Sequence, residues 1–156
     1  MAVPGTQVAK QIILDTNVIE YAFSPYGSQK KKAIAILDSI RKGLYDGILC
    51  TPVIMELVYR LSDNIGPANA GSFLWTLVSM PNMYVKTHTL DMALSAGEFY
   101  YRYNTISSSL KKPSAVDCLI AGMCKHTMGS AVCTNDGQIL GITDIQCVPF
   151  WKLKTS

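Results

Sequence analysis

Four acidic residues follow predicted strands or lie in the first turns of predicted helices. They are Asp15, Glu56, Asp117 and Asp136. In an open parallel sheet the functional crevice lies outside the carboxyl ends of the strands, so residues far apart in the sequence can converge there. Carboxylates that converge raise each other's pKa, and a divalent cation relieves their repulsion. Ligands that are all oxygen favour a hard ion, Mg²⁺ or Mn²⁺, which can activate water and stabilise the charge that develops on a phosphate.

Each acid also has an ordinary structural interpretation. Asp15 could cap the helix that follows it, and Glu56 could be a solvated helix residue. Asp117 stands three residues after Ser114, which is the spacing of a capping box. The segment Asn135-Asp136-Gly137 is a favourable turn sequence. The common placement of all four acids favours the functional interpretation, although no single acid establishes it.

The elements that must position these acids alternate between strand and helix. The sequence predicts strands over residues 11–14, 48–50, 83–87, 131–134 and 145–148. It predicts helices over residues 17–23, 29–42, 51–61, 67–79, 89–103 and 114–127, a short turn or helix over 136–140, and a basic loop over 107–113. Thr51 is the expected N-cap of its helix, with Pro52 at the first helical position. This alternation predicts an α/β fold with a mainly parallel sheet, and 156 residues fit a single domain spanning 1–156.

Composition limits the class of protein. Hydrophobic residues make up 49% and charged residues 16%, which argues against disorder. The net charge of +3 permits a polyanionic partner. Five cysteines without a C-x-x-C motif indicate free thiols in a reducing compartment, and the two histidines do not suit a zinc site. With no signal peptide or membrane-spanning segment apparent, we expect a cytoplasmic protein with no membrane partner.

Four stretches carry a resemblance to a known family. They are LDTNVIEY, TPVIMELVYRL, PSAVDCLIAGMCK and VCTNDGQIL, which contain the four acids in order. With these stretches the chain resembles the PIN-domain family of metal-dependent ribonucleases over nearly its whole length. The departures are modest: Gly122 stands where a second alanine is common, and Ile139 where many members carry phenylalanine.

The resemblance implies a three-layer α/β/α sandwich and cleavage of RNA with Mg²⁺ or Mn²⁺. It implies metal binding by Asp15, Glu56, Asp117 and Asp136, with Thr16, Asn17 and Thr134 hydrogen-bonded to ligand carboxylates. Small members of the family are most often VapC-type toxins, dimeric and inhibited by a protein antitoxin. A homodimer and an antitoxin are therefore expected here. Stand-alone members of this size that act in RNA processing are the alternative.

Basic and aromatic residues suggest where RNA would bind. Lys111 and Lys112 directly precede the Asp117 helix and, with Lys125, are the candidate phosphate contacts, whereas the run 30–32 is better interpreted as a solvated face. The tyrosines in segment 100–103 are expected to serve core packing and a dimer surface, and Asp144 is expected at the surface.

Other classes of protein fit less well. A receiver-like domain would need an acidic pair after the first strand, and a haloacid-dehalogenase-type phosphatase would need an aspartate where Asn17 stands. An inactive PIN domain that only binds RNA or protein stays open.

Overall fold

Residues 10–24, 27–106 and 112–155 of the computed structural model are described here, and they form one parallel sheet between two layers of helices. The five strands run in the order β3-β2-β1-β4-β5. Their bounds are β1 (Gln11–Leu14), β2 (Asp46–Cys50), β3 (Met83–Lys86), β4 (Ser130–Thr134) and β5 (Cys147–Pro149). Every pair of neighbouring strands is parallel.

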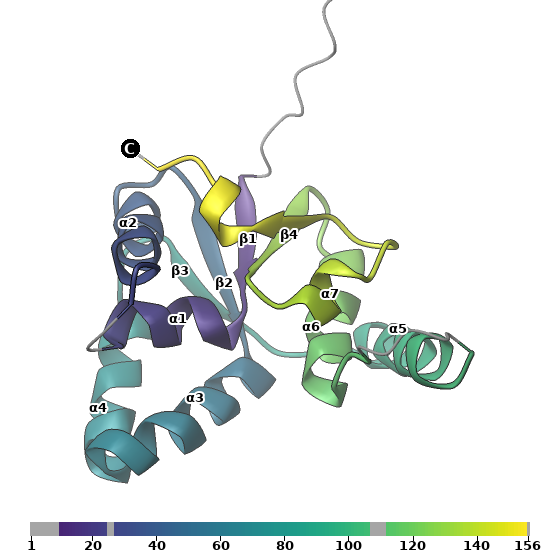
Figure 1. Ribbon diagram of the computed structural model, residues 1–156, viewed down its shortest axis with the longest axis horizontal. Coiled ribbons are helices and arrows are strands. Elements are labelled where there is room, and N and C mark those ends of the chain that lie inside the picture. Colours follow the sequence, from purple (N-terminus) through teal and green to yellow (C-terminus); the bar gives the residue numbers. More distant parts are fainter. Residues whose placement is uncertain (1–9, 25–26, 107–111, 156) are drawn as a thin grey trace, which may run out of the picture.

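The helices cover both faces of the sheet. They are α1 (Thr16–Phe23), α2 (Lys30–Arg41), α3 (Thr51–Ile65), α4 (Pro67–Val78), α5 (Leu90–Tyr101), α6 (Ala115–Lys125) and α7 (Gly137–Leu140). Two short helical turns complete the structure, the π-helical Arg102–Ile106 and the 3₁₀ turn Phe150–Lys152. Figure 1 shows α1 to α4 on one side of the sheet and α5 to α7 on the other. The predicted three-layer α/β/α sandwich is confirmed.

The central strands bring separate parts of the sequence to one edge. The side chains of β1 and β4 are nearly all fully buried, as expected for a parallel sheet covered on both faces. Leu14 pairs with Cys133, and the backbone N–H of Asp15 donates to the carbonyl of Cys133 (3.1 Å), so Asp15 and Thr134 emerge side by side. The adjacent strand β2 ends at the same edge, where α3 begins.

The second strand is longer than its sequence predicts. Tyr45-Asp46-Gly47 has the local sequence of a turn, and the predicted strand covers only residues 48–50. This prediction is wrong for the last two residues of the turn, because Asp46 and Gly47 pair with β1 and Gly47 also pairs with Met83. A β-carbon at Gly47 would lie 2.9 Å from Cδ1 of Ile40 and 3.0 Å from the sulfur of Met83, so a larger residue here would require these two side chains to shift. Tertiary packing, which a local turn signal does not report, therefore decides the conformation here.

Helix boundaries differ from the predictions by a few residues. Thr51 is not the N-cap of α3, because it is already the first helical residue, while Pro52 lies in the first turn as expected. This helix continues past residue 61 to Ile65 and ends at Gly66, whose φ of 80° suits glycine. Most of the basic loop predicted over 107–113 lies outside the described residues.

The departure at Gly122 has a steric reason. Helix α6 packs so closely on α5 that a β-carbon at Gly122 would lie 2.3 Å from the backbone oxygen of Met92. No real β-carbon approaches a backbone atom that closely. Glycine at this position therefore permits the close contact of the two helices.

The cysteines are free, as the sequence predicts. Four are buried and Cys147 is half-buried, and burial raises the pKa of these thiols, that of Cys118 to about 11 and that of Cys133 to about 12. No helix in the described part of the chain is long and apolar enough to cross a membrane.

Candidate metal centre

Asp15 is buried at the carboxyl end of β1, with three donors directed at its carboxylate. Its Oδ1 accepts from the backbone N–H of Thr16 (2.7 Å), which makes Asp15 the N-cap of α1. Its Oδ2 accepts from Asn17 Nδ2 (2.6 Å) and from Thr134 Oγ1 (2.6 Å). Asp15 is therefore both a helix cap and a carboxylate held in one orientation at the sheet edge. The contacts expected of Asn17 and Thr134 are present.

Glu56 lies in the second turn of α3 and faces α1. Its Oε2 accepts from Thr16 Oγ1 (2.7 Å), so Thr16 contacts Glu56 through its side chain rather than Asp15. Its Oε1 accepts from Arg60 one turn later (2.5 Å). Arg60 also reaches Oε2 of Glu20 on α1 (3.2 Å). Both carboxylate oxygens of Glu56 are thus engaged by the protein.

Asp117 forms the capping box at the start of α6. Its Oδ2 accepts from the backbone N–H of Ser114 (2.6 Å), while its own N–H donates to Ser114 Oγ (3.1 Å). The capping box explains why Asp117 is held rigidly, but it uses only Oδ2. Within the described part of the chain, Oδ1 has no hydrogen-bond donor, which leaves it free for a ligand. The structural and functional interpretations of this residue are therefore compatible.

Asp136 caps α7 and is joined to Asp15 through one hydroxyl group. Its Oδ1 accepts from the backbone N–H of Gln138 (2.7 Å). The hydroxyl of Thr134 accepts from the backbone N–H of Asp136 (2.8 Å) and donates to Asp15. Thr134 therefore sets the relative positions of these two acids.

The four acids influence one another electrostatically. Burial raises the pKa of Asp15 from 3.8 to about 6, and the charges of Asp117 and Asp136 add to this rise against the opposing hydrogen bonds from Thr134 and Thr16. Burial also raises the pKa of Asp117, with further contributions from the charges of Asp136 and Glu56. Scattered along the sequence, these acids lie close enough in the fold to form an acidic cluster.

The cluster suits a hard cation in its chemistry but not yet in its geometry. Every candidate ligand is a carboxylate, and burial, with a smaller contribution from the charges of neighbouring acids, raises the pKa of Asp15 and Asp117, which a bound cation would counteract. Among the residues described, however, no three acidic, histidine or cysteine side chains lie close enough together to hold a metal ion. Glu56 is turned towards Arg60 and Thr16. Binding of a cation by Glu56 would therefore compete with the ion pair between Glu56 and Arg60.

Of the candidate phosphate-binding lysines, Lys111 lies outside the described residues. Lys112 is exposed just before α6, where its Nζ donates to the backbone oxygen of Asn104 (2.6 Å). In the run 30–32, Lys32 is not merely solvated: its Nζ donates to the backbone oxygen of Leu153 (2.5 Å) and holds the C-terminal segment. Of the two candidate phosphate contacts that the structure describes, Lys112 and Lys125, Lys112 stands nearer to Asp117 in the sequence.

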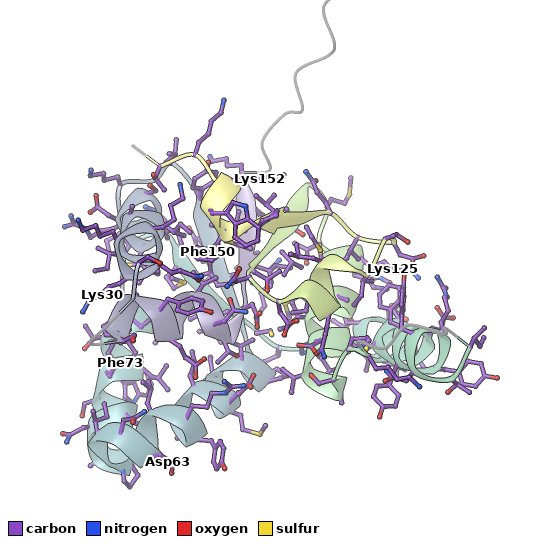
Figure 2. The ribbon with its side chains drawn as sticks, viewed as in Figure 1. Lys30, Asp63, Phe73, Lys125, Phe150 and Lys152 are labelled. Atoms are coloured by element: carbon purple, nitrogen blue, oxygen red, sulfur yellow. The ribbon has the colours of Figure 1, made fainter. Side chains whose placement is uncertain are left out.

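Lys125 stands at the other end of α6 from Asp117. Eight residues of helix separate the two, roughly 12 Å along the axis. Its Nζ lies 3.7 Å from Glu98 on α5. Figure 2 shows Lys125 and Lys30 on opposite sides of the molecule, so these basic side chains do not belong to one patch.

The sequence did not single out Arg60, the cation at the edge of the acidic cluster. The available signal was its spacing of four residues from Glu56 on one helix, which is the spacing of an ion pair. The sequence placed Asn135 in a turn but did not predict its contacts: its Nδ2 donates to Tyr21 and Gln29 and so ties the end of β4 to α1 and the start of α2. Both contacts depend on tertiary structure.

The segment 100–103 differs from its prediction. Tyr100 and Tyr101 are exposed, so the expectation that they pack in the core is wrong. Tyr103 instead donates to Asp144 (2.9 Å), which also pairs with Arg102 (2.7 Å). Asp144 is exposed, as predicted.

Comparison with solved structures shows relatives of the same fold. FitAcB from Neisseria gonorrhoeae is 22% identical with a TM-score of 0.66, over 91% of this chain and 99% of that one. VapBC2 from Rickettsia felis, bound to a DNA fragment from its promoter, is 17% identical with a TM-score of 0.68, over 88% and 97%. VapC20 from Mycobacterium tuberculosis, a sarcin–ricin loop cleaving toxin, is 16% identical with a TM-score of 0.64, over 86% and 98%.

Comparison with family models agrees with this fold. No curated protein matches the chain significantly. The family model described as the PIN domain matches residues 12–143, a range that includes all four acids. The chain therefore belongs to the PIN domain family.

Proposed function

We propose that this protein is a ribonuclease that depends on a divalent cation, Mg²⁺ or Mn²⁺. Membership of the PIN domain family supports a nuclease in general. The observation that carries the proposal is the acidic cluster at the carboxyl edge of the sheet, where burial and neighbouring charges raise the pKa of Asp15 and Asp117. Such a cluster is costly to keep unless it binds a cation.

Asp15, Glu56, Asp117 and Asp136 would hold the cation. When bound, the cation would supply Lewis acidity at the phosphate and an activated water for hydrolysis. Asn17 and Thr134 keep the carboxylate of Asp15 in place, and Thr16 positions Glu56. The capping box fixes Asp117 while leaving one oxygen for the cation. Asp136 would complete the ligand set from the start of α7.

The structural neighbours suggest the biological setting. VapC20 is described as a sarcin–ricin loop cleaving toxin, and VapBC2 is described as bound to a DNA fragment from its promoter. We infer from this likeness in fold that the protein is the toxin of a toxin–antitoxin pair, with RNA as substrate and a protein antitoxin as inhibitor. The free thiols support a reducing compartment such as the cytoplasm.

A homodimer is part of this proposal. Strand β3 is an edge strand of the sheet, and it exposes Tyr84 and Val85. On α4, which contacts β3, Trp75 is 74% exposed and lines an apolar groove together with Val85. An uncovered apolar groove beside a sheet edge favours self-association. Analytical ultracentrifugation of wild type and Trp75→Ser tests this: wild type should sediment as a dimer and the variant should shift towards monomer.

Cleavage of a mixed RNA pool tests the activity. Wild type, Asp117→Asn and the matched control Asp144→Asn would be incubated with Mg²⁺, Mn²⁺ or EDTA. We expect cleavage by wild type and the control with metal only, and none by Asp117→Asn. Absence of cleavage by folded wild type with either metal would contradict the proposal and favour a PIN domain that only binds RNA or protein.

Growth on induction separates a toxin from a stand-alone nuclease of RNA processing. Expression of wild type without a partner should arrest growth of a bacterial host, and expression of Asp117→Asn should not. Normal growth with an active wild-type nuclease would favour the processing role.

A further inference from the structure

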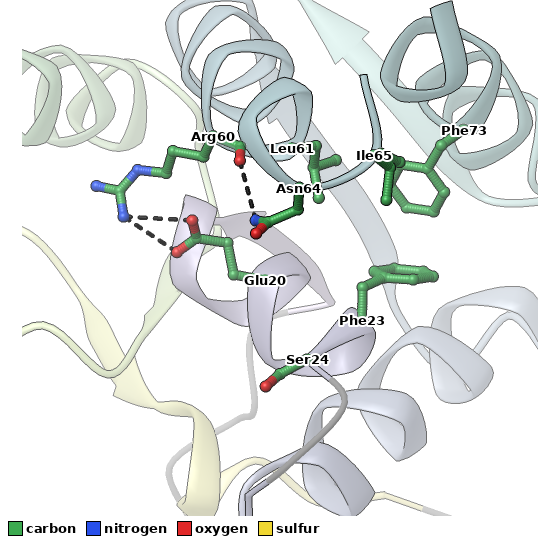
Figure 3. Close-up of a pocket in the computed structure, with 8 residues that line it drawn as sticks. All are labelled: Glu20, Phe23, Ser24, Arg60, Leu61, Asn64, Ile65 and Phe73. Atoms are coloured by element: carbon green, nitrogen blue, oxygen red, sulfur yellow. Dashed lines mark hydrogen bonds and ion pairs between the residues drawn. The ribbon is translucent and has the colours of Figure 1, made fainter. Parts of the chain in front are cut away.

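Arg60 joins the acidic cluster to a neighbouring groove. One guanidinium nitrogen donates to Glu56 on the same helix (2.5 Å), and another lies 3.2 Å from Oε2 and 3.3 Å from Oε1 of Glu20 on α1. Figure 3 shows Arg60 and Glu20 at one end of a groove whose other end is formed by Phe23, Ile65 and Phe73. The groove has a volume of about 700 Å³.

The position of Arg60 conflicts with cation binding by Glu56. As long as the guanidinium holds Oε1, Glu56 directs its charge towards Arg60 rather than towards Asp117. A divalent cation would compete with Arg60 for this carboxylate. Glu20 would keep Arg60 at the edge of the cluster after the exchange, because the pair with Glu20 involves a different guanidinium nitrogen.

If a cation replaces Arg60 as the partner of Glu56, one guanidinium nitrogen of Arg60 loses its acceptor at the edge of the acidic cluster. The side chain of Arg60 is 48% exposed, so an RNA backbone can reach it. Planar guanidinium groups match the oxygens of phosphate, and their charge-assisted hydrogen bonds are among the strong ones. Within the described part of the chain, Arg60 is the one cationic side chain paired with an acid of the cluster. A phosphate approaching four carboxylates needs such a counter-charge.

We propose that Arg60 is a phosphate-binding residue of this centre. It releases Glu56 to the cation and donates to a phosphate oxygen of the RNA backbone instead, while Glu20 holds it in place. This inference rests on the proposed ribonuclease function. The structure offers a matched control in Arg102, which is 47% exposed and is likewise paired with an aspartate, Asp144, that is not one of the four acids of the cluster.

Steady-state cleavage of an RNA oligonucleotide at saturating Mn²⁺ tests the proposal. We expect Arg60→Gln to lose roughly ten- to a hundredfold in kcat/KM, the loss expected for one hydrogen bond between charged groups. Arg60→Lys should retain part of the lost activity, because lysine keeps the positive charge but lacks the planar guanidinium group that can donate two parallel hydrogen bonds. Arg102→Gln should match wild type. Equal cleavage by Arg60→Gln and Arg102→Gln would overturn the proposal.

Mn²⁺ binding without RNA separates this role from a merely structural one. Since Arg60 competes with the cation, Arg60→Gln should bind Mn²⁺ at least as tightly as wild type by calorimetry. Weaker binding that parallels the loss of cleavage would overturn the proposal, because Arg60 would then only support the metal site. If wild type itself neither cleaves RNA nor binds Mn²⁺, the proposed function fails first, and the inference with it.

Discussion

The raised pKa of Asp15 predicts an unusual dependence of stability on pH. In the unfolded chain Asp15 ionises near 3.8, but in the folded, metal-free protein it ionises near 6 because it is buried. Between these values the folded state binds the proton more tightly. The stabilising contribution of this group is therefore fully present below about pH 4 and is lost as pH rises through 6.

The magnitude follows from the two pKa values. A rise from 3.8 to about 6, at 1.36 kcal/mol for each pH unit, corresponds to roughly 3 kcal/mol of unfolding free energy lost by pH 7. Asp15→Asn carries no charge at any pH and removes this dependence. The amide also offers one acceptor oxygen where Thr16, Asn17 and Thr134 all donate, so the variant loses a further amount that is constant with pH.

Denaturant unfolding in EDTA between pH 4 and 7.5 measures the effect. The difference in unfolding free energy between wild type and Asp15→Asn should fall by roughly 2–2.5 kcal/mol from pH 4 to 7, the larger part of the full effect. Asp144→Asn is the control: Arg102 and Tyr103 lower the pKa of Asp144, so its contribution should rise with pH and stay small because it is exposed. If the difference between wild type and Asp15→Asn does not change with pH, the pKa of Asp15 is not raised in the folded protein.

Further predictions concern the packing and capping that hold the centre in place. Gly122→Ala should lower the unfolding free energy by about 1–3 kcal/mol in denaturant titrations, because its β-carbon would overlap the backbone of Met92. The control Gly97→Ala, on the exposed face of α5, should be neutral or stabilising. An unfolding free energy for Gly122→Ala equal to that of wild type would contradict the close packing of α5 and α6. Ser114→Ala should lower the unfolding free energy by about 1 kcal/mol because the capping hydroxyl is lost. The variant should still cleave RNA with metal, because the backbone N–H of residue 114 continues to donate to Asp117. Loss of cleavage as complete as in Asp117→Asn would contradict this prediction.

Much of the fold could be predicted from local sequence. The short apolar runs Ile12-Ile13-Leu14 in β1 and Ala131-Val132-Cys133 in β4 are typical of strands buried on both faces, and the amphipathic segments between strands predict the covering helices. Because parallel strands end at one edge, the positions of Asp15 and Asp136 after such strands already suggested that they converge. The extent of β2 was missed because its first residues are held by neighbouring strands rather than by their own propensity.

The interior of the candidate centre was less accessible from sequence. Capping and ligand roles seemed to be alternatives for Asp117, but the structure shows that one carboxylate oxygen can cap while the other stays free. The partners of Glu56 depend on side-chain rotamers and on the packing of α1 against α3, which no local pattern encodes. The same holds for the exposure of Tyr101 on α5, which depends on what covers that helix.

The most direct measurement is anomalous scattering from Mn²⁺ in a crystal of the wild-type protein. We expect one peak at the carboxyl edge of the sheet, within ligand distance of Asp15 and Asp117, with Glu56 turned away from Arg60 towards the ion. Absence of a peak at the acidic cluster, in crystals saturated with Mn²⁺ near neutral pH, would contradict this expectation.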